Sequence, residues 1–249
     1  MSKRALCWWL LGVAAYLVFL GVNLPAQYLA NHVSKNLSEL QLGGVSGNVF
    51  SGSANEVRYQ GTSLGAVDWH FDWLAPFTLS LGYRIDLRAQ DRNLNGRVDF
   101  GFNRITLHGF EGHIPLSAIS GWLPLPPNSL DGFLTPHLKQ LSIRSGRLVS
   151  AEGELDLDET ALRWPTAAVL GSFRVQLTPM ADGFQAEATD ASSPLKLQAY
   201  LSFSSEGAYH LSGTLAARNP GDEATRSLLA GLGRPDSTGQ YPFDFKGQW

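Results

Sequence analysis

Apolar and polar residues alternate through most of the chain after residue 66. The longest unbroken run covers residues 77–88, with an apolar side chain at every odd position and a polar residue or glycine at every even one. A period of two matches the alternating faces of a β-strand and cannot form one face of a helix. Shorter runs of the same kind occur at 67–73, 98–102, 105–107, 141–143, 155–157, 173–177 and 195–203. The pattern predicts strands with one apolar and one polar face, as in antiparallel sheets.

Turn signals separate these runs and set the fold class. Four dipeptides typical of tight hairpins lie between them: Gln60-Gly61, Asn95-Gly96, Asp182-Gly183 and Glu206-Gly207. Strand signals recur about every 10–15 residues, which leaves no room for crossover helices. The sequence therefore predicts a mostly β protein built from antiparallel sheet.

Prolines interrupt the alternation in the middle of the chain. Within residues 115–136 they are Pro115, Pro124, Pro126, Pro127 and Pro136. Because proline lacks the N–H that a β-ladder needs, this stretch is predicted to connect two β halves, residues 42–114 and 137–249. Near the end, Asp222 is a good N-cap for a short helix over 222–232.

The N-terminus carries a long hydrophobic segment. Lys3 and Arg4 precede residues 5–22, which contain no charged side chain. A helix of this length spans about 27 Å, and extension to residue 24 brings it close to the ~30 Å hydrocarbon core of a bilayer. We expect a transmembrane anchor over 5–24 and a cytoplasmic tip at 1–4, because positive charges before a span favour the cytoplasm. The rest of the chain would then be periplasmic.

A cleaved signal peptide is the alternative for this segment. Signal-peptide hydrophobic regions are shorter, about 7–15 residues, and end at a small-x-small site. Leu24, Pro25 and Ala26 match that site poorly, so we favour the anchor. Without Lys3 and Arg4 the exported part keeps 17 of the 19 basic residues against 22 acidic ones, a net charge of −5. An anionic membrane surface gives such a domain no overall electrostatic attraction.

A short amphipathic helix is predicted over residues 25–41. Pro25 suits the first turn of a helix, where its missing N–H costs nothing. Apolar residues then recur at helical spacing, at Leu29, Val33, Leu37 and Leu40. The helix should end near Gly43 and Gly44. Its apolar stripe would lie either on the bilayer or, as we favour, against the following sheet.

Composition excludes several classes of protein. Charged residues make up 16% and hydrophobic residues 44% of the 249, which excludes an intrinsically disordered chain. The net charge of −3 argues against nucleic-acid binding, which needs a basic face. Cys7 is the only cysteine, so no intramolecular disulfide can form.

Two segments match catalytic or calcium-binding motifs in part. Residues 61–65 read G-x-S-x-G, but a nucleophile elbow needs a helix after it, and here a strand pattern follows. We interpret this segment as a hairpin turn. A calcium-loop pattern begins with Asp91, Asn93, Asn95 and Gly96, but the position of its bidentate glutamate holds Phe102. A polar hairpin tip explains these residues better.

A third cluster could bind a divalent metal. Asp68, His70 and Asp72 share one face of a predicted strand, opposite an apolar face that includes Trp69. Such polar positions are expected on a solvated strand face in any case. We therefore expect no metal site, no cofactor and no catalytic residue, and we predict that the protein is not an enzyme.

Several segments carry a family resemblance. Residues 44–54, GVSGNVFSGSA, directly follow the predicted anchor and helix, and LGAVDWHF comes next at 64–71. Near the C-terminus the corresponding segments are LAGLGRPD at 229–236 and GQYPF at 239–243. Together they resemble type II secretion system protein N over essentially the whole chain. The resemblance implies an accessory inner-membrane component of a machinery that exports folded proteins, with no family catalytic residues to carry over.

Two functions follow from these inferences. In the first, exposed strand edges dock other type II secretion subunits, either the outer-membrane secretin or the bitopic inner-membrane proteins, by β-augmentation. In the second, the protein binds lipid or acyl chains, because its two-half layout is distantly similar to AsmA/TamB-type proteins with curved sheets. An ordinary core formed by two halves packed face to face would argue against the second. We favour docking.

Overall fold

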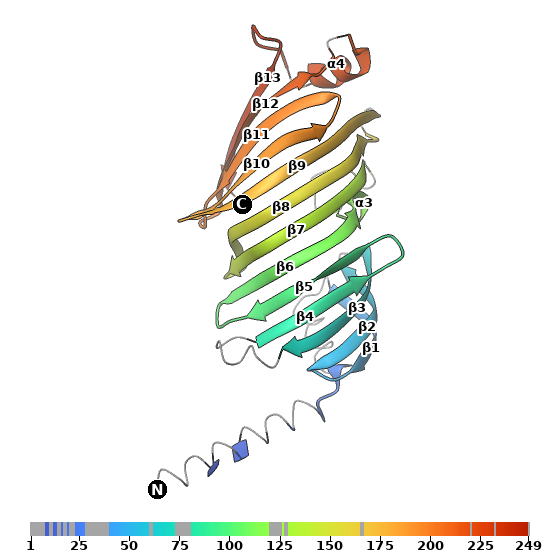
Figure 1. Cartoon of the computed structure of the whole chain (residues 1–249), viewed down its shortest axis with the longest axis vertical. Helices are drawn as coiled ribbons and strands as arrows, with labels where there is room; N and C mark the ends of the chain where they lie inside the picture. Colours follow the sequence, from blue (N-terminus) through green and yellow to red (C-terminus); the bar gives the residue numbers. More distant parts are fainter. Residues whose placement is uncertain are drawn as a thin grey trace.

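The protein forms one long, twisted and curved β-sheet, shown as a computed structural model in Figure 1. The structure describes residues 8, 9, 12, 13, 16, 19, 23–27, 40–59, 62–72, 81–119, 126, 129–164, 167–219, 221–231 and 233–248. The elements, in chain order, are β1 (Leu40–Gly47), β2 (Ser51–Tyr59), β3 (Thr62–Asp72), β4 (Leu81–Arg88), β5 (Asn93–Phe100), β6 (Arg104–Pro115), α3 (Leu116–Ile119), β7 (Leu130–Arg144), β8 (Arg147–Leu162), β9 (Ala168–Met180), β10 (Gly183–Ser192), β11 (Leu195–Phe203), β12 (Ala208–Ala217), α4 (Glu223–Ala230) and β13 (Tyr241–Gln248).

Each strand pairs only with its immediate neighbours in the chain, so the spatial order of the described strands is β1 to β13. All of these pairings are antiparallel, and the predicted mostly β, antiparallel fold is confirmed. In such a meander, successive turns lie alternately at opposite ends of the strands. We call the end with the turns that follow odd-numbered strands the odd rim, and the opposite end the even rim. In Figure 1 the β5–β6 and β7–β8 turns lie on the left and the β4–β5 turn on the right.

The two predicted β halves belong to one continuous sheet. β6 and β7, on either side of the proline-rich segment, pair from Arg104↔Arg144 to Pro115↔Phe133. The predicted connector over 115–136 is also shorter than expected, because β7 begins at Leu130 and runs through Pro136. Pro136 lies opposite Leu155 of β8, and its missing N–H is tolerated because the β6–β7 pairing has a gap between Glu111↔His137 and Ile114↔Leu134.

The predicted turns have mixed outcomes. Turns at Asp182-Gly183 and Glu206-Gly207 are confirmed, whereas Gln60-Gly61 lies outside the described residues. The turn predicted at Asn95-Gly96 is wrong, because both residues lie inside β5 and the β4–β5 turn is formed by residues 89–92. Gly96 serves packing there: a Cβ atom would lie 2.5 Å from the ring of Phe110.

In the described part of the chain, few large apolar side chains are fully buried. One cluster joins β8, β9 and β10 through Ala151, Leu177, Phe184 and Ala186. The two helices each contribute one fully buried leucine, Leu116 in α3 and Leu229 in α4. Helix α3 contacts β6 and β7, and α4 contacts β9 and β12.

The predicted C-terminal helix is confirmed as α4. Asp222 precedes the helix, and its carboxylate accepts a hydrogen bond from the Thr225 hydroxyl in the first turn. The helix ends where the N–H of Gly231 donates to the carbonyl of Leu228 at 3.3 Å. An acidic residue at the start and a glycine just after the end are common helix signals.

The predicted amphipathic helix over 25–41 does not extend as far as expected. Leu40 and Gln41 already belong to β1, and Gly43 and Gly44 lie inside that strand. Gly44 adopts a φ of +63°, a left-handed conformation that interrupts the β1–β2 pairing between Gly43↔Glu56 and Val45↔Ala54. Residues 28–39 of the prediction lie outside the described part of the chain.

The described N-terminal residues are mostly helical. Backbone at 8, 9, 12, 13, 16, 19 and 23 is helical, and the apolar side chains of Trp8, Trp9, Tyr16 and Phe19 are largely exposed. Among the residues that the structure describes, no helix has both the length and the apolar character needed to cross a bilayer. The anchor over 5–24 therefore stays a prediction.

Candidate functional site

The segment that carries the family resemblance folds as the β1–β2 hairpin. Asn48 organises its turn, because its Oδ1 accepts hydrogen bonds from the backbone N–H groups of Phe50 at 2.9 Å and Ser51 at 2.8 Å. The carbonyl of Asn48 in turn accepts a hydrogen bond from the Trp69 indole N–H at 3.2 Å. The hairpin is thereby tied to β3, and Asn48 is a structural residue here.

Two glycines let this hairpin close. Gly47 has a φ of +88°, in the left-handed region that favours glycine. At Gly52 a Cβ atom would lie 2.4 Å from the ring of Trp69 and 2.5 Å from the carbonyl oxygen of Ser46. The motif therefore encodes a close approach between backbone and indole rather than a reactive site.

A row of aromatic rings crosses the sheet from this hairpin. Phe50 contacts Phe71 with ring centroids 5.1 Å apart, Phe71 contacts Tyr83 at 5.3 Å, and Tyr83 contacts Phe100 at 6.0 Å. All three contacts are edge-to-face, a favoured geometry for aromatic pairs. Burial among these apolar groups raises the pKa of the Tyr83 hydroxyl.

Strand register extends the apolar surface over the whole sheet. Trp69 lies opposite Ile85 between β3 and β4, and Val175 lies opposite Leu155 between β8 and β9. Farther along, Leu201 lies opposite Ala186 on one side and Leu211 on the other. We call this continuous surface, which runs from β1 to β13, the apolar face.

No second sheet packs on the apolar face within the described part of the chain. Each strand contacts mainly the strands with which it pairs. β8 and β10 also contact each other, but they lie on either side of β9 in the same sheet. Many apolar side chains are consequently only half buried, and a few, such as Leu81 and Phe245, are more than 50% exposed. The apolar face is thus a long surface that is partly open to solvent.

Ion pairs within strands and between strands lie on the opposite, polar face. Arg174 lies 2.9 Å from Asp156 and 2.6 Å from Glu154. Arg97 similarly contacts Asp99 at 2.8 Å and Asp72 at 2.7 Å. The hydrogen bond that Arg174 donates to Asp156 raises the pKa of the Arg174 guanidinium. Such exposed pairs are typical of a solvated sheet surface and contribute little individually.

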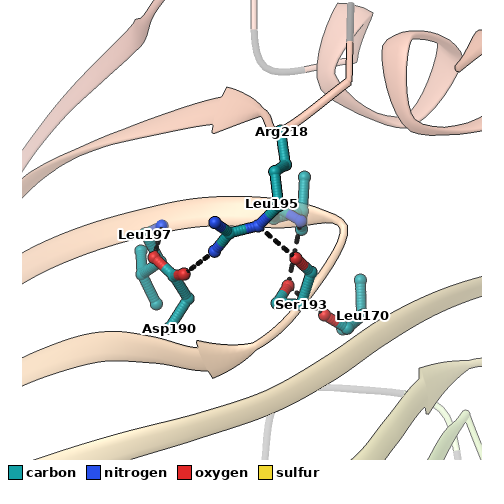
Figure 2. Close-up of polar contacts among 6 residues, drawn as sticks. All are labelled: Leu170, Asp190, Ser193, Leu195, Leu197 and Arg218. Atoms are coloured by element: carbon teal, nitrogen blue, oxygen red, sulfur yellow. Dashed lines mark hydrogen bonds and ion pairs between the residues drawn. The ribbon is translucent and has the colours of Figure 1, made fainter.

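A denser polar cluster holds the β10–β11 turn against β12 (Figure 2). Arg218 donates from Nε to the carbonyl of Ser193 at 2.8 Å and forms an ion pair with Asp190. Asp190 also accepts a hydrogen bond from the backbone N–H of Leu197 at 2.9 Å, and the Ser193 hydroxyl donates to the carbonyl of Leu170. Four strands, β9 to β12, meet in this network. Its groups satisfy one another, so we assign it a structural role.

The G-x-S-x-G segment contributes no nucleophile elbow. Ser63 lies near the start of β3, and that strand continues to Asp72 without a helix. The carbonyl of Ser63 accepts a hydrogen bond from Arg92 at 3.0 Å. Gly61 lies outside the described residues, so the turn that we predicted there stays a prediction.

The acidic candidate metal ligands pair with arginine side chains. Asp91 pairs with Arg92 at 3.0 Å, and this hydrogen bond lowers the pKa of the Asp91 carboxyl. Asp68 and Asp72 lie beside Arg88 and Arg97, at 3.7 and 2.7 Å. In the described ranges, no group of three or more His, Cys, Asp or Glu side chains gathers closely enough to hold a metal ion.

Comparison with known proteins identifies the family. The family model described as type II secretion system (T2SS), protein N, matches residues 38–244. The chain belongs to this family. The predicted resemblance is confirmed, and the matched region extends from just before β1 into β13. As a family member, the protein is a component of type II secretion.

Three relatives, each named type II secretion system protein N, align over nearly their full lengths. The protein of Vibrio cholerae serotype O1 is 28% identical over 253 residues, or 99% of both chains. That of Aeromonas hydrophila is 28% identical over 252 residues, or 95% of both chains. The Klebsiella pneumoniae protein is 26% identical over 261 residues, with 99% of this chain and 97% of the relative covered. No solved structure matches significantly.

The aromatic row was not predictable from the sequence as a unit. Phe71, Tyr83 and Phe100 follow the alternation, but their alignment depends on register across two strand pairs. Phe50 lies in a turn, outside any alternating run. The signal that could have found it is its place in the 44–54 segment.

Proposed function

We propose that this protein is an accessory inner-membrane component of a type II secretion system. A single span over residues 5–24 anchors it, the N-terminus is cytoplasmic, and the periplasmic sheet docks other subunits during export of folded proteins. The secretin and the bitopic inner-membrane proteins are the proposed partners. The role is non-catalytic and needs no cofactor.

The observation that carries the docking proposal is that the sheet is open, with β1 and β13 at its edges. The two edges differ in chemistry. β13, YPFDFKGQ, contains a proline and charged residues, which discourage pairing with another strand. β1, LQLGGVSG, contains neither proline nor a charged residue. We therefore propose that β1 pairs with an extended segment of a partner subunit.

Exposed aromatic side chains support the anchor. Trp8, Trp9, Tyr16 and Phe19 belong to helical backbone, and each is more than 60% exposed. Such residues on a helix are costly in water and favourable in a lipid environment or at its interface.

Site-specific photo-cross-linking in a secreting cell tests the docking proposal. A photoreactive amino acid replaces the exposed Gln41 in β1, and a matched one replaces the exposed Asp244 in β13. We expect the probe in β1 to capture another secretion subunit, identified by mass spectrometry, and the probe in β13 to capture none. Equal capture at both positions, or none at position 41 while exoproteins are secreted, would contradict docking through β1.

Lipid binding is a second candidate function, favoured because no second sheet covers the apolar face among the residues that the structure describes. The face-to-face core that would argue against it is not present among the described strands. The full chain would be purified in detergent, and lipids that co-purify after extensive washing would be quantified by mass spectrometry. Retention of phospholipid in stoichiometric amount, reduced by Val98→Asp on the apolar face and unchanged by Arg84→Asp on the polar face, supports this function. No retained lipid, or equal retention by both variants, contradicts it.

A further inference from the structure

Three arginines form a row across the odd rim. Arg104 at the start of β6 lies directly opposite Arg144 at the end of β7, and Arg144 lies directly opposite Arg147 at the start of β8. All three side chains are exposed. Directly opposed residues have Cβ atoms about 4.5–5.5 Å apart, and like charges in this arrangement destabilise a sheet. The sheet therefore concentrates positive charge here at a cost to its own stability.

The row has no acidic counterpart in the described ranges. No carboxylate there lies within ion-pair distance of Arg104, Arg144 or Arg147, in contrast to Arg97 and Arg174 on the polar face. Arg147 makes one weak contact, from Nη1 to the backbone carbonyl of Glu206 at 3.4 Å. The charge of the three guanidinium groups is thus available to an external anion.

Exposed apolar side chains lie at the same part of the odd rim. Phe102, at the tip of the β5–β6 turn, is fully exposed. Next to it, Leu81, Phe100 and Ile105 are each more than a third exposed and lie opposite one another across β4, β5 and β6. Large apolar groups beside a cationic group are typical of surfaces that insert shallowly into a bilayer and contact anionic headgroups.

The N-terminal segment reaches the sheet at the same rim. Pro25 forms an antiparallel bridge with Asn48 in the β1–β2 turn, which lies at the odd rim, and Ala26 is fully buried. The apolar N-terminal residues are therefore joined to the sheet beside its odd rim, four strand spacings or roughly 19 Å from the β5–β6 turn.

We propose that the odd rim contacts the surface of an anionic bilayer, with Phe102 inserted among the lipids and Arg104, Arg144 and Arg147 bound to headgroup phosphates. The negative net charge of the sheet predicted no attraction to such a surface. Local charge decides instead, because screening limits electrostatic attraction to about 10 Å at 0.1 M salt. This inference rests on the proposed anchor only for the orientation of the sheet, and it does not require the docking of other subunits.

Nitroxide depth measurements on the full chain test this proposal. In a Cys7→Ser background, single cysteines replace Phe102 at the odd rim, Gln90 in the β4–β5 turn at the even rim and Phe19 in the predicted anchor. Each labelled protein is reconstituted in vesicles of phosphatidylcholine alone or with one quarter phosphatidylglycerol. Power saturation then compares the access of oxygen, which enters lipid, with that of a water-soluble nickel chelate.

We expect the label at position 102 to be lipid-exposed in the anionic vesicles and water-exposed in the neutral ones, and the label at position 90 to be water-exposed in both. Arg144→Gln should lower the ratio of lipid-inserted to water-exposed label at position 102 about fivefold. Arg88→Gln at the even rim should not change this ratio. A water-exposed position 102 in anionic vesicles overturns the proposal. Equal insertion in both vesicle types overturns the role of the arginines.

The label at position 19 separates this result from the anchor. A lipid-exposed position 19 with a water-exposed position 102 overturns the rim contact and leaves the anchor standing. A water-exposed position 19 overturns the anchor, and position 102 then reports by itself whether the rim binds the added vesicles. A circular-dichroism melt of each variant, matched to that of the parent, shows that the sheet is intact.

Discussion

At the scale of single residues, glycines in this sheet differ in whether a neighbour occupies the space where their side chain would be. At Gly52, the ring of Trp69 and the carbonyl of Ser46 both approach to 2.5 Å or less of a Cβ position. The backbone carbonyl cannot move without distorting the hairpin. At Gly101 the nearest atom, the carbonyl oxygen of Arg104, would lie 3.4 Å away. The first glycine is therefore required by packing, and the second is not.

We predict that Gly52→Ala lowers the free energy of unfolding by about 1–3 kcal/mol, because even one added methyl group overpacks the Trp69 contact. Gly101→Ala is the matched control and should change it by less than about 0.5 kcal/mol. Urea denaturation of the full chain, followed by tryptophan fluorescence, measures both. Equal unfolding midpoints for the two variants would show that the hairpin relaxes around the added group.

At the scale of elements, strands were predictable where alternation of apolar and polar residues alone determines them. They were not predictable where packing or pairing with an adjacent strand determines them. Residues 81–88 alternate and form β4, and Asp222 correctly indicated the start of α4. Asn95-Gly96 is a typical turn dipeptide, yet it lies inside β5. There the ring of Phe110 on β6 occupies the space where a side chain at position 96 would be. β1 begins at Leu40, inside the segment over 25–41 that was predicted to be a helix, because pairing with β2 outweighs local propensity.

Also at this scale, the Asp190–Arg218 network should stabilise the β10–β11 turn more than an exposed pair does. Arg218→Met removes a hydrogen bond to the Ser193 carbonyl and leaves a largely buried Asp190 carboxylate without its counter-ion. We expect a loss of about 1–3 kcal/mol in unfolding free energy. Arg58→Met, which removes an exposed pair with Glu56, should cost under about 1 kcal/mol. Thermal unfolding of both variants measures the difference, and similar losses would contradict the assigned role.

At the scale of the whole molecule, the family and the antiparallel character of the sheet could be predicted, but its continuity could not. The prolines between 115 and 136 indicated a boundary, whereas β6 and β7 pair directly across it. The row of Arg104, Arg144 and Arg147 was equally hidden, because these residues are up to 43 positions apart in the numbered chain and meet only through register. Register depends on turn lengths and bulges that hydrophobic periodicity does not report.

The strict order of strands also bears on how the protein reaches its native state. Because every strand finds its partner in the adjacent stretch of polypeptide, a hairpin can close as soon as its second half has emerged, without waiting for distant residues. A chain delivered from one end, from a ribosome or through an export channel, can therefore assemble progressively. Insertion of one further hairpin at a turn would also lengthen the molecule while the existing hairpins keep their internal pairings.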